Sequence, residues 1–424
     1  MHYQACKRAN GTIRDGITTA VLALTFNFCG NSAAQAQASQ PQQNVFTLQA
    51  GGGEEYDSNV FRLPDSADNE TVLGTTGRAD WITQGYVGLQ VDKPYHQQEF
   101  RLNASAYKYW YQQFSYLNFD ATDFKGNWLW HFTPELSGNL SADRQQQLIN
   151  YADYTDYTQR NVQTTYDYVY TLDWQAFGGW HTVGSAALTG RHNSFSYTAQ
   201  SSYRSDYGEA GFKYVLRSGS YIEAVAQRTY GVYLDQPLDE VNLIDTGYHE
   251  NGGELRFKQF SPPGAVFSGI YLAAGYLSRV ETNIYQRDYD GWTAHFQGAW
   301  NPTQKIAVKL SGGRDVSQYT TAYSSYDIIN SLSLTPQWAV SDKVTVRAEY
   351  DYSIVDYEQA VLPSPSGRKD ILHTYQLGLE WTPYRFADIS AVIQDGGRLS
   401  SYVGTDYQYR DWAGSLSVSL QFGK

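Results

Sequence analysis

A regular spacing of short turn signals is the feature of this sequence that most restricts its fold. The turns lie around Lys93, Pro134, Gly178, Ser218, Pro262, Pro302, Asp342 and Pro383. Successive turns are 40 to 44 residues apart, and a fixed period of this size indicates a repeated structural unit. Each period holds two long runs of about 10 to 15 residues, the length of strands that cross a membrane at a tilt. A propeller of similar period would have four short strands per repeat, and the chain lacks the Gly-His and Trp-Asp signatures of that class.

The stretch from Ser331 to Tyr350 shows what one unit contains. Apolar residues of one parity flank a polar turn at Asp342, namely Leu332, Leu334, Trp338 and Val340 before it and Val344, Val346, Ala348 and Tyr350 after it. Successive side chains of a strand point to opposite faces. The stretch is therefore predicted to be a β-hairpin with one apolar and one polar face.

Long polar segments rich in tyrosine and aspartate separate the predicted hairpins at their other ends. The clearest are 54–77, 147–163, 234–247 and 358–370. Short turns at one end and long loops at the other are typical of an outer-membrane barrel with its long loops outside the cell. Eight short turns join sixteen strands, and 44–53 and 412–422 add a first and a last strand. The sequence thus predicts an all-β fold, a transmembrane antiparallel up-and-down β-barrel of about 18 strands.

The composition agrees with a barrel. The mean hydropathy is −0.51 and charged residues make up 17% of the chain, which by itself would fit a protein dissolved in water. A membrane barrel has a similar average because only every second residue meets lipid. Aromatic residues reach 16%, with 37 tyrosines, and Tyr and Trp favour the boundary between membrane and water.

The N-terminal residues predict export from the cytoplasm. A basic region with Lys7, Arg8 and Arg14 precedes the apolar run 17–28, and small-x-small cleavage sites follow at 34–38. This order is typical of a secretory signal peptide. We expect a signal peptide at 1–36, a short periplasmic segment at 37–43 and the barrel at 44–424, in the outer membrane of a Gram-negative bacterium. Both cysteines, Cys6 and Cys29, lie in the signal, so the mature chain would have no disulfide.

Parity predicts which side chains line the lumen. Barrel strands in lipid must close, because an unpaired backbone group there costs several kcal/mol. Eighteen strands enclose a lumen too wide for their own side chains to fill. The residues predicted to line the solute pathway are Arg101, Lys213, Arg256, Lys258, Lys309, Arg347 and Glu349. The same parity places Asp143, Glu223 and Asp388 inside. Two interpretations stay open, namely mutual neutralisation of the two signs and a basic track for an anionic polymer.

The segment 151–160 is the candidate contact with sugar outside the cell. It contains Tyr151, Tyr154, Tyr157 and Arg160 among acidic residues, and such groups can stack on sugar rings and bind their hydroxyls. An aromatic girdle at the outer interface would need the same residue types.

No catalytic or cofactor motif stands out. The eight histidines are scattered without metal-ligand spacing, and the chain has neither a Gly-x-Ser-x-Gly elbow nor a Walker loop. We therefore expect no catalytic residues, no metal and no cofactor. Without 1–36 the chain carries 28 basic and 42 acidic residues, which argues against nucleic acid as a partner.

The segment Glu55-Tyr-Asp-Ser-Asn-Val-Phe-Arg62, just after the first strand, resembles a known family. A Tyr-Asp-Ser-Asn-Val/Ile-Phe-Arg segment at this place is similar to that of EpsL-type outer-membrane proteins from bacterial exopolysaccharide operons, within a wider group of β-barrel porins. The resemblance covers the whole mature chain and implies that it carries a new polysaccharide across the outer membrane. It supplies no catalytic residues. We further expect Asp57 and Asn59 to fix the start of the first long loop by side-chain-to-backbone hydrogen bonds.

The leading hypothesis is therefore an exopolysaccharide export channel with a polar, water-filled lumen. Its partners would be outer-membrane lipid, the polysaccharide and periplasmic export or synthesis proteins. The first alternative is a general or solute-selective porin. The second is an outer-membrane enzyme that modifies lipid or glycan, whose Ser, His and acidic residues would meet only in space.

Overall fold

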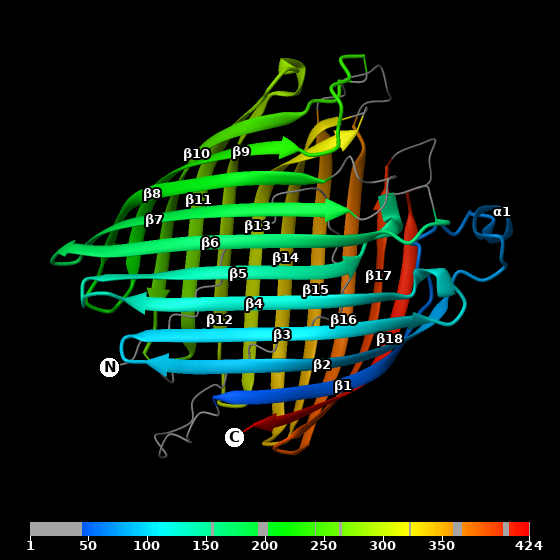
Figure 1. Ribbon diagram of the computed structural model, residues 1–424, viewed down its shortest axis with the longest axis horizontal. Helices are drawn as coiled ribbons and strands as arrows, with labels where there is room; N and C mark the ends of the chain where they lie inside the picture. Colours follow the sequence, from blue (N-terminus) through cyan, green and yellow to red (C-terminus); the bar gives the residue numbers. More distant parts are fainter. Residues whose placement is uncertain are drawn as a thin grey trace.

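The chain forms one closed antiparallel barrel of 18 strands in a computed structural model (Figure 1). The structure describes residues 45–153, 157–193, 202–241, 243–262, 265–321, 324–358, 367–401 and 407–423. The predicted signal peptide 1–36 and the segment 37–43 lie outside these residues. Each strand pairs with its sequence neighbours, and β1 also pairs with β18. The predicted fold class and strand number are confirmed.

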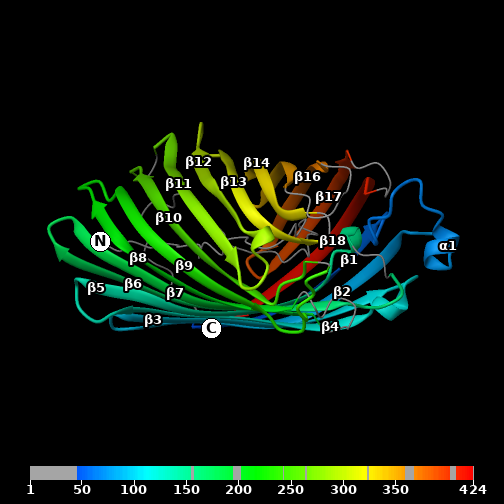
Figure 2. The same cartoon turned by 90° about the horizontal axis from the view of Figure 1, so that it is seen from above.

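The strands are 12 to 18 residues long, long enough to cross a bilayer at a tilt. The first nine are β1 Phe46–Asp57, β2 Asp80–Tyr95, β3 Gln98–Tyr111, β4 Phe119–His131, β5 Leu136–Leu148, β6 Val162–Phe177, β7 Trp180–Asn193, β8 Tyr203–Val215 and β9 Tyr221–Tyr233. The other nine are β10 Gly247–Phe260, β11 Phe267–Glu281, β12 Tyr289–Trp300, β13 Ile306–Thr321, β14 Ser324–Ser341, β15 Val344–Glu358, β16 Lys369–Tyr384, β17 Ala387–Ser400 and β18 Tyr409–Gly423. Seen from above, the strands on the two sides of the barrel incline in opposite directions (Figure 2).

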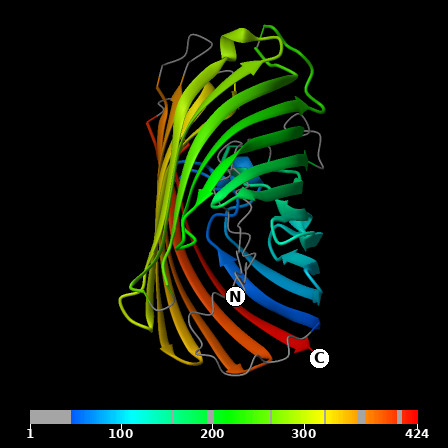
Figure 3. The same ribbon diagram turned by 90° about the vertical axis from the view of Figure 1, so that its left-hand side faces the viewer.

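The seam between β1 and β18 closes the barrel. The two strands pair in register from Thr47 opposite Gly423 to Asp57 opposite Ala413, and the sheet curves round until its two ends meet (Figure 3). In hydrocarbon an open edge would leave a row of unpaired N–H and C=O groups, each costing several kcal/mol. Closure removes both edges at once.

Alternation gives the barrel its two faces. On β14 Leu332, Leu334 and Trp338 are exposed to the surroundings, as the hairpin pattern predicts. Large exposed aromatic side chains gather near the turns, including Phe132, Phe177, Trp338, Trp381 and Phe422. This belt is the arrangement expected at a membrane boundary.

Short turns join the strands at one end, here called the turn end. At the other end, the loop end, most connections are longer, although β13 and β14 are only two residues apart in the sequence. All eight predicted short turns exist, but two lie two or three residues later than the signals at Lys93 and Pro383, at 96–97 and 385–386. Pro94 and Pro383 are instead strand residues close to their turns, where a missing N–H is tolerated. β1 also extends beyond the predicted residue 53 to Asp57, because its last residues still pair with β2 and β18.

In the part of the chain that the structure describes, helical structure is confined to short pieces at the loop end: the α-helix α1 Asn69–Leu73 and the 3-10 turns η1 Ser115–Leu117, η2 Tyr151–Asp153 and η3 Tyr285–Arg287. Among the described residues, no helix is both long and apolar enough to cross a membrane.

Two loops on opposite parts of the barrel repeat one design. The segments around η1 and η3 follow β3 and β11, and each is fastened by one buried aspartate at the start of the strand's own hairpin: Asp80 begins β2 and Asp245 precedes β10. Asp80 accepts the backbone N–H groups of Gln112, Gln113 and Phe114 at 2.8 to 3.0 Å. Asp245 accepts those of Asn283 and Ile284 at 2.6 and 2.7 Å. Each carboxylate satisfies donors that a tight turn would otherwise leave unpaired.

Asp245 lies outside the strands, and its pKa is the balance of two effects. Burial raises the pKa, but hydrogen bonds from Asn283, Ile284 and Thr246 outweigh burial and hold it below the usual range. A carboxyl whose pKa is lower in the folded than in the unfolded state stabilises fully above its unfolded pKa of about 3.9, and this contribution disappears as pH falls through the folded pKa.

We expect Asp245→Asn to lower the free energy of unfolding at pH 7 by about 2 kcal/mol, because hydrogen bonds to a charged acceptor are lost. The difference from wild type should shrink as the pH falls below about 4. Urea unfolding in detergent micelles at pH 7 and at acid pH measures both values. A difference that stays constant over this range would contradict the assigned role of the charge.

Candidate functional site: lumen and loop end

The inner face of the barrel and the loops over its loop end form the candidate site. Every predicted pathway residue lies on a strand at a position that alternates with lipid-facing side chains. For example, Lys213 lies between the exposed Phe212 and Tyr214, and Arg256 follows the exposed Leu255. The inward parity assigned from the sequence agrees with this exposure, whereas the transport role of these residues stays a prediction.

A charged sector covers the inner face from β6 to β13. At its centre, Arg256 contacts three carboxylates: Glu209 at 2.6 Å, Glu223 at 2.8 Å and Glu254. Beside it Lys213 pairs with Asp173, whose other oxygen lies 2.6 Å from His181 Nδ1. Further round, His295 Nε2 lies 2.9 Å from Asp315. Acidic side chains thus lie next to Lys, Arg or His along this part of the wall, and His295 Nδ1, 3.9 Å from Glu254, connects the pair with Asp315 to the group around Arg256.

The other predicted cations are distributed differently. Arg101 lies 2.6 Å from Glu99, and Arg347 lies 2.9 Å from Glu349. Lys258 Nζ lies 5.0 Å from the ring centroid of Phe260, and Lys309 is exposed on β13. Four of the six predicted pathway cations, Arg101, Lys213, Arg256 and Arg347, therefore have an acidic neighbour, which favours mutual neutralisation over a basic track.

An uncharged sector covers the inner face of β18, β1, β2 and β3 at mid-height. Its inward side chains are Gln49, Gln84, Tyr86, Gln90, Asn103, Ser105, Tyr107, Ser415, Ser417 and Ser419, with glycines between them. The lipid-facing positions that alternate with them include the exposed Leu48, Val87, Leu416 and Val418. Charged inward residues of these strands lie only towards their ends, such as Glu55 and Arg101. This sector can exchange hydrogen bonds with a solute but offers it no ion pair.

The segment Glu55–Arg62 forms a compact knot at the loop end of the seam. Asn59 is completely buried; its amide group donates to the carbonyls of Leu63 and Arg410 and accepts the Leu63 N–H, at 2.8 to 3.1 Å. Asp57 accepts the Asn59 N–H at 2.8 Å. The expectation that Asp57 and Asn59 fix the start of the first long loop is confirmed. The bond to Arg410, on β18, also ties this loop to the seam.

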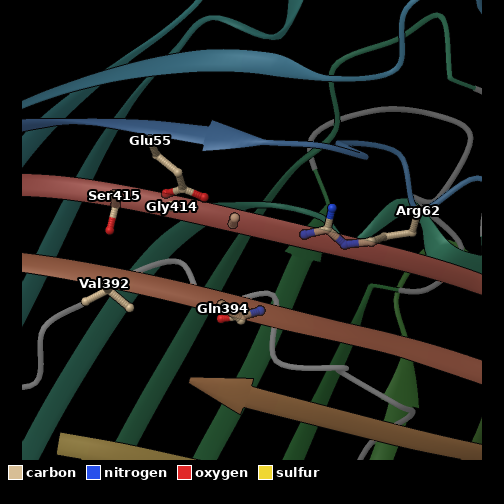
Figure 4. Close-up of a pocket in the computed structure, with 7 residues that line it drawn as sticks. Glu55, Arg62, Val392, Gln394, Gly414 and Ser415 are labelled. Atoms are coloured by element: carbon tan, nitrogen blue, oxygen red, sulfur yellow. The ribbon is translucent and has the colours of Figure 1, made fainter. Parts of the chain in front are cut away.

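Arg62 completes the knot. It lies in the left-handed region at φ 55° and contacts Asp57 at 2.8 Å and Asp411 at 3.5 Å. Burial alone would lower the pKa of Arg62, but the two carboxylates raise it, so the guanidinium keeps its charge. Below the knot, Glu55, Arg62, Gln394 and Ser415 line a cavity of about 20 Å³ (Figure 4). Its volume suits about one water molecule and is too small for a sugar.

Three loops pack into one apolar cluster over the β1–β5 part of the barrel. Phe61 of the first loop makes edge contacts with Phe114 at 4.8 Å, Tyr151 at 5.2 Å and Tyr157 at 5.7 Å between ring centroids. We call these loops, with their buried residues Phe61, Leu63, Phe114, Leu117, Ile149 and Tyr151, the loop cluster. The backbone carbonyl of Ala152 in η2 accepts a hydrogen bond of 2.7 Å from Arg398 on β17. The loop after β5 therefore reaches across the mouth to the far side of the seam.

Three of the four predicted sugar-contact residues, Tyr151, Tyr157 and Arg160, are part of this cluster or lie beside it. Tyr151 is buried and its hydroxyl donates to the Gln159 carbonyl at 2.8 Å. The carbonyl of Tyr157 accepts from the Tyr116 hydroxyl at 2.5 Å, and Arg160 donates to the Asn118 carbonyl. In this arrangement the Tyr151 ring serves loop packing, while Tyr154 lies outside the described residues. Contact with sugar stays a prediction for these four residues.

Sequence reasoning did not find Arg398 or the tyrosines at 86 and 107 as site residues. Parity could have placed them inside, but Arg398 contacts Ala152 and Tyr86 contacts Ser419, partners that lie 246 and 333 residues away in the chain. Within the described part of the chain, no cluster of His, Cys, Asp and Glu could hold a metal ion.

A closed 18-stranded barrel with an apolar outer face and a polar inner face defines a porin-like outer-membrane β-barrel, and the protein is located in the outer membrane of a Gram-negative bacterium. A protein-family model described as "Putative beta-barrel porin 2" matches residues 245–422, most of β10 to β18. No curated protein matches the sequence.

Solved structures of similar shape include two Pseudomonas aeruginosa proteins. OccK1 (OpdK) is 10% identical, with 89% of this chain and 99% of that chain covered and a TM-score of 0.49. OccK2 (OpdF), solved with glucuronate, is 11% identical, with 90% and 98% covered and a TM-score of 0.48. Acinetobacter baumannii OccAB3 is 9% identical, with 89% and 99% covered and a TM-score of 0.48. Similarity at this level does not bear on what this chain transports.

Charge reversals should distinguish the largely buried cation Arg256 from the exposed cation Arg347. We expect Arg256→Glu to lower the free energy of unfolding by about 3 kcal/mol or more, because it adds a fourth carboxylate to a half-buried group of three. Arg347 is a matched control, since its side chain is 59% exposed and contacts one carboxylate. Arg347→Glu should change ion selectivity but leave the folded, heat-modifiable gel band intact. Equal urea midpoints for the two variants would contradict the assigned role of the ion pairs around Arg256.

Removal of the hydrogen bond from Arg398 to the Ala152 carbonyl should widen the mouth of the barrel. We expect Arg398→Met to raise single-channel conductance and current noise in a planar bilayer, because the Ala152 carbonyl loses its donor. Asp370 would keep its contacts with Arg368 and Ser400, so the barrel should stay folded. Arg410→Met is the control, because Arg410 lies on the next strand and its exposed side chain pairs with Asp395 instead. Conductance unchanged in both variants would refute a role for this hydrogen bond at the mouth.

Proposed function

We propose that this barrel is a passive outer-membrane channel for a carbohydrate polymer, an exopolysaccharide leaving the cell. The observation that carries the proposal is the uncharged sector on β18, β1, β2 and β3. Hydroxyl and amide groups there can replace the water around sugar hydroxyls one by one as a chain moves. The opposite wall is charged, but its cations are largely neutralised by neighbouring carboxylates, so it does not trap a polyanion.

The loop end supports the same proposal. The segment from Glu55 to Arg62, which resembles the EpsL-type sequence, folds the first loop onto the seam and into the loop cluster. This cluster narrows the mouth on one side with side chains held by buried hydrogen bonds. A chain already threaded through the lumen would pass beside it. Polymer synthesis and periplasmic partners would supply the driving force.

A solute-selective porin is the second candidate, and the family-model match with β-barrel porins favours it. The two candidates differ in what the open lumen passes. A porin would conduct small ions freely and continuously after purification. An export channel whose mouth is narrowed by loops would conduct them weakly until Arg398 is replaced.

A deletion strain tests export directly. We expect cells that lack this chain to make polymer at the normal rate but to accumulate it in the periplasm. Re-expression of the wild-type chain should restore secretion, whereas a chain truncated after β17 should not, because it cannot close the seam. Polymer in the periplasm and in the medium is measured by sugar analysis of the two fractions. Normal secretion by the deletion strain would remove the export proposal and leave the porin.

A further inference from the structure

A continuous row of aromatic rings runs along the uncharged sector. Its members are Tyr86 on β2, Tyr107 and Tyr109 on β3 and Phe119 at the start of β4. Ring centroids are 5.5 Å apart between Tyr86 and Tyr107, 6.3 Å between Tyr107 and Tyr109, and 4.5 Å between Tyr109 and Phe119. The planes of successive rings differ by 30° or less. Phe119 is a buried member of the loop cluster, and Tyr107 and Tyr109 pack against that cluster, but all three tyrosines are only half-buried. We call Tyr86, Tyr107 and Tyr109 the tyrosine row.

The wall is shaped to seat the first ring. Tyr86 reaches from β2 across β1, and its hydroxyl forms a 2.7 Å hydrogen bond with Ser419 on β18. The ring passes over Gly51, where a Cβ atom would lie 2.5 Å from Tyr86 Cε1. Such a contact is far inside the van der Waals distance, so the glycine is required for the ring to lie there. The ring is thus held at a fixed place on the wall.

Uncharged polar groups surround the row. Gln84 and Gln90 precede and follow Tyr86 on the same face of β2, and Ser105 and Asn103 continue the face of β3 towards the turn end. Asp123 on β4 borders the row and accepts the Gln146 N–H at 3.0 Å. The row is therefore an apolar strip between amide and hydroxyl groups, and the carboxylates of Asp123 and Glu55 lie near it.

This combination matches the chemistry of a sugar unit. One face of a pyranose ring presents C–H groups, which pack on an aromatic surface, while its hydroxyls need donors and acceptors at the sides. Stacking does not depend on which sugar unit lies on the aromatic ring, so a sugar chain can move from one tyrosine to the next. A leucine or valine would fill the same wall volume without a planar surface or a hydroxyl.

We propose that the tyrosine row is a binding site for neutral sugar units inside the lumen. The row leads from mid-wall at Tyr86 to the loop cluster at Phe119, so it guides a chain towards the mouth. This inference rests on the proposed carbohydrate cargo, but it identifies where on the wall the cargo binds.

Current blockade in a planar bilayer tests the site without any secretion assay. The probe is a neutral gluco-oligosaccharide of six units, added to purified wild-type barrel under a constant voltage. We expect a saturable reduction of ion current, and roughly tenfold higher half-blocking concentrations for Tyr86→Ala and for Tyr107→Ala. Tyr86→Phe keeps the ring and should stay within about threefold of wild type. Tyr271→Ala, which removes an inward tyrosine of the charged sector on β11, should bind like wild type.

The heat-modifiable gel band confirms that each variant is folded before it is measured. A wild-type barrel that the oligosaccharide does not block, or folded alanine variants blocked as easily as wild type, would overturn the inference. A six-unit uronate oligomer that blocks equally well would overturn its restriction to neutral sugars. Normal polymer secretion by the deletion strain together with tyrosine-dependent blockade would refute export while leaving the sugar site in place.

Discussion

Backbone pairing without a free edge is the constraint on which the rest of this structure depends. Hydrocarbon cannot satisfy a peptide N–H or C=O group, so every strand needs a partner on both sides, and the pairing of β1 with β18 supplies the last one. This seam joins residues more than 350 positions apart in the chain. The knot of Asn59, Arg62 and Asp411 lies at its loop end and adds buried hydrogen bonds and an ion pair where the ladder stops. The first long loop thus depends on closure for its own anchor.

Closure also creates two unlike walls inside one lumen. On β6 to β13 charged side chains compensate one another, as the three carboxylates around Arg256 show. On β18 to β3 serine, glutamine, asparagine and tyrosine take their place. A solute that carries many hydroxyls and little charge interacts with the second wall without having to break ion pairs on the first. The proposed carbohydrate cargo rests on this division, which also gives the tyrosine row its surroundings.

At the loop end, polar and apolar contacts both hold the loops in place. Asp80 and Asp245 fasten two loops by accepting backbone N–H groups, whereas Phe61 and Tyr151 hold three loops together by packing. Tyr151 belongs to a segment whose composition indicates sugar contact, yet its ring is buried in the cluster. A loop rich in aromatic and acidic residues can therefore bury its aromatic rings, because the rings pack against neighbouring loops.

The sequence by itself determined the barrel, because alternation and turn spacing are local and each recurs in every hairpin. It gave the number of strands, the inward parity of Lys213, Arg256 and Arg347, and the anchoring role of Asp57 and Asn59. Strand ends such as Asp57 and the turns at 96–97 and 385–386 differed by a few residues, since pairing across the sheet decides where a strand stops. Only the tertiary structure decided that Arg256 meets three carboxylates, that Arg398 reaches Ala152, and that Tyr86 lies over Gly51 beside Ser419. These contacts join strands and loops that parity places on one face but does not place next to each other.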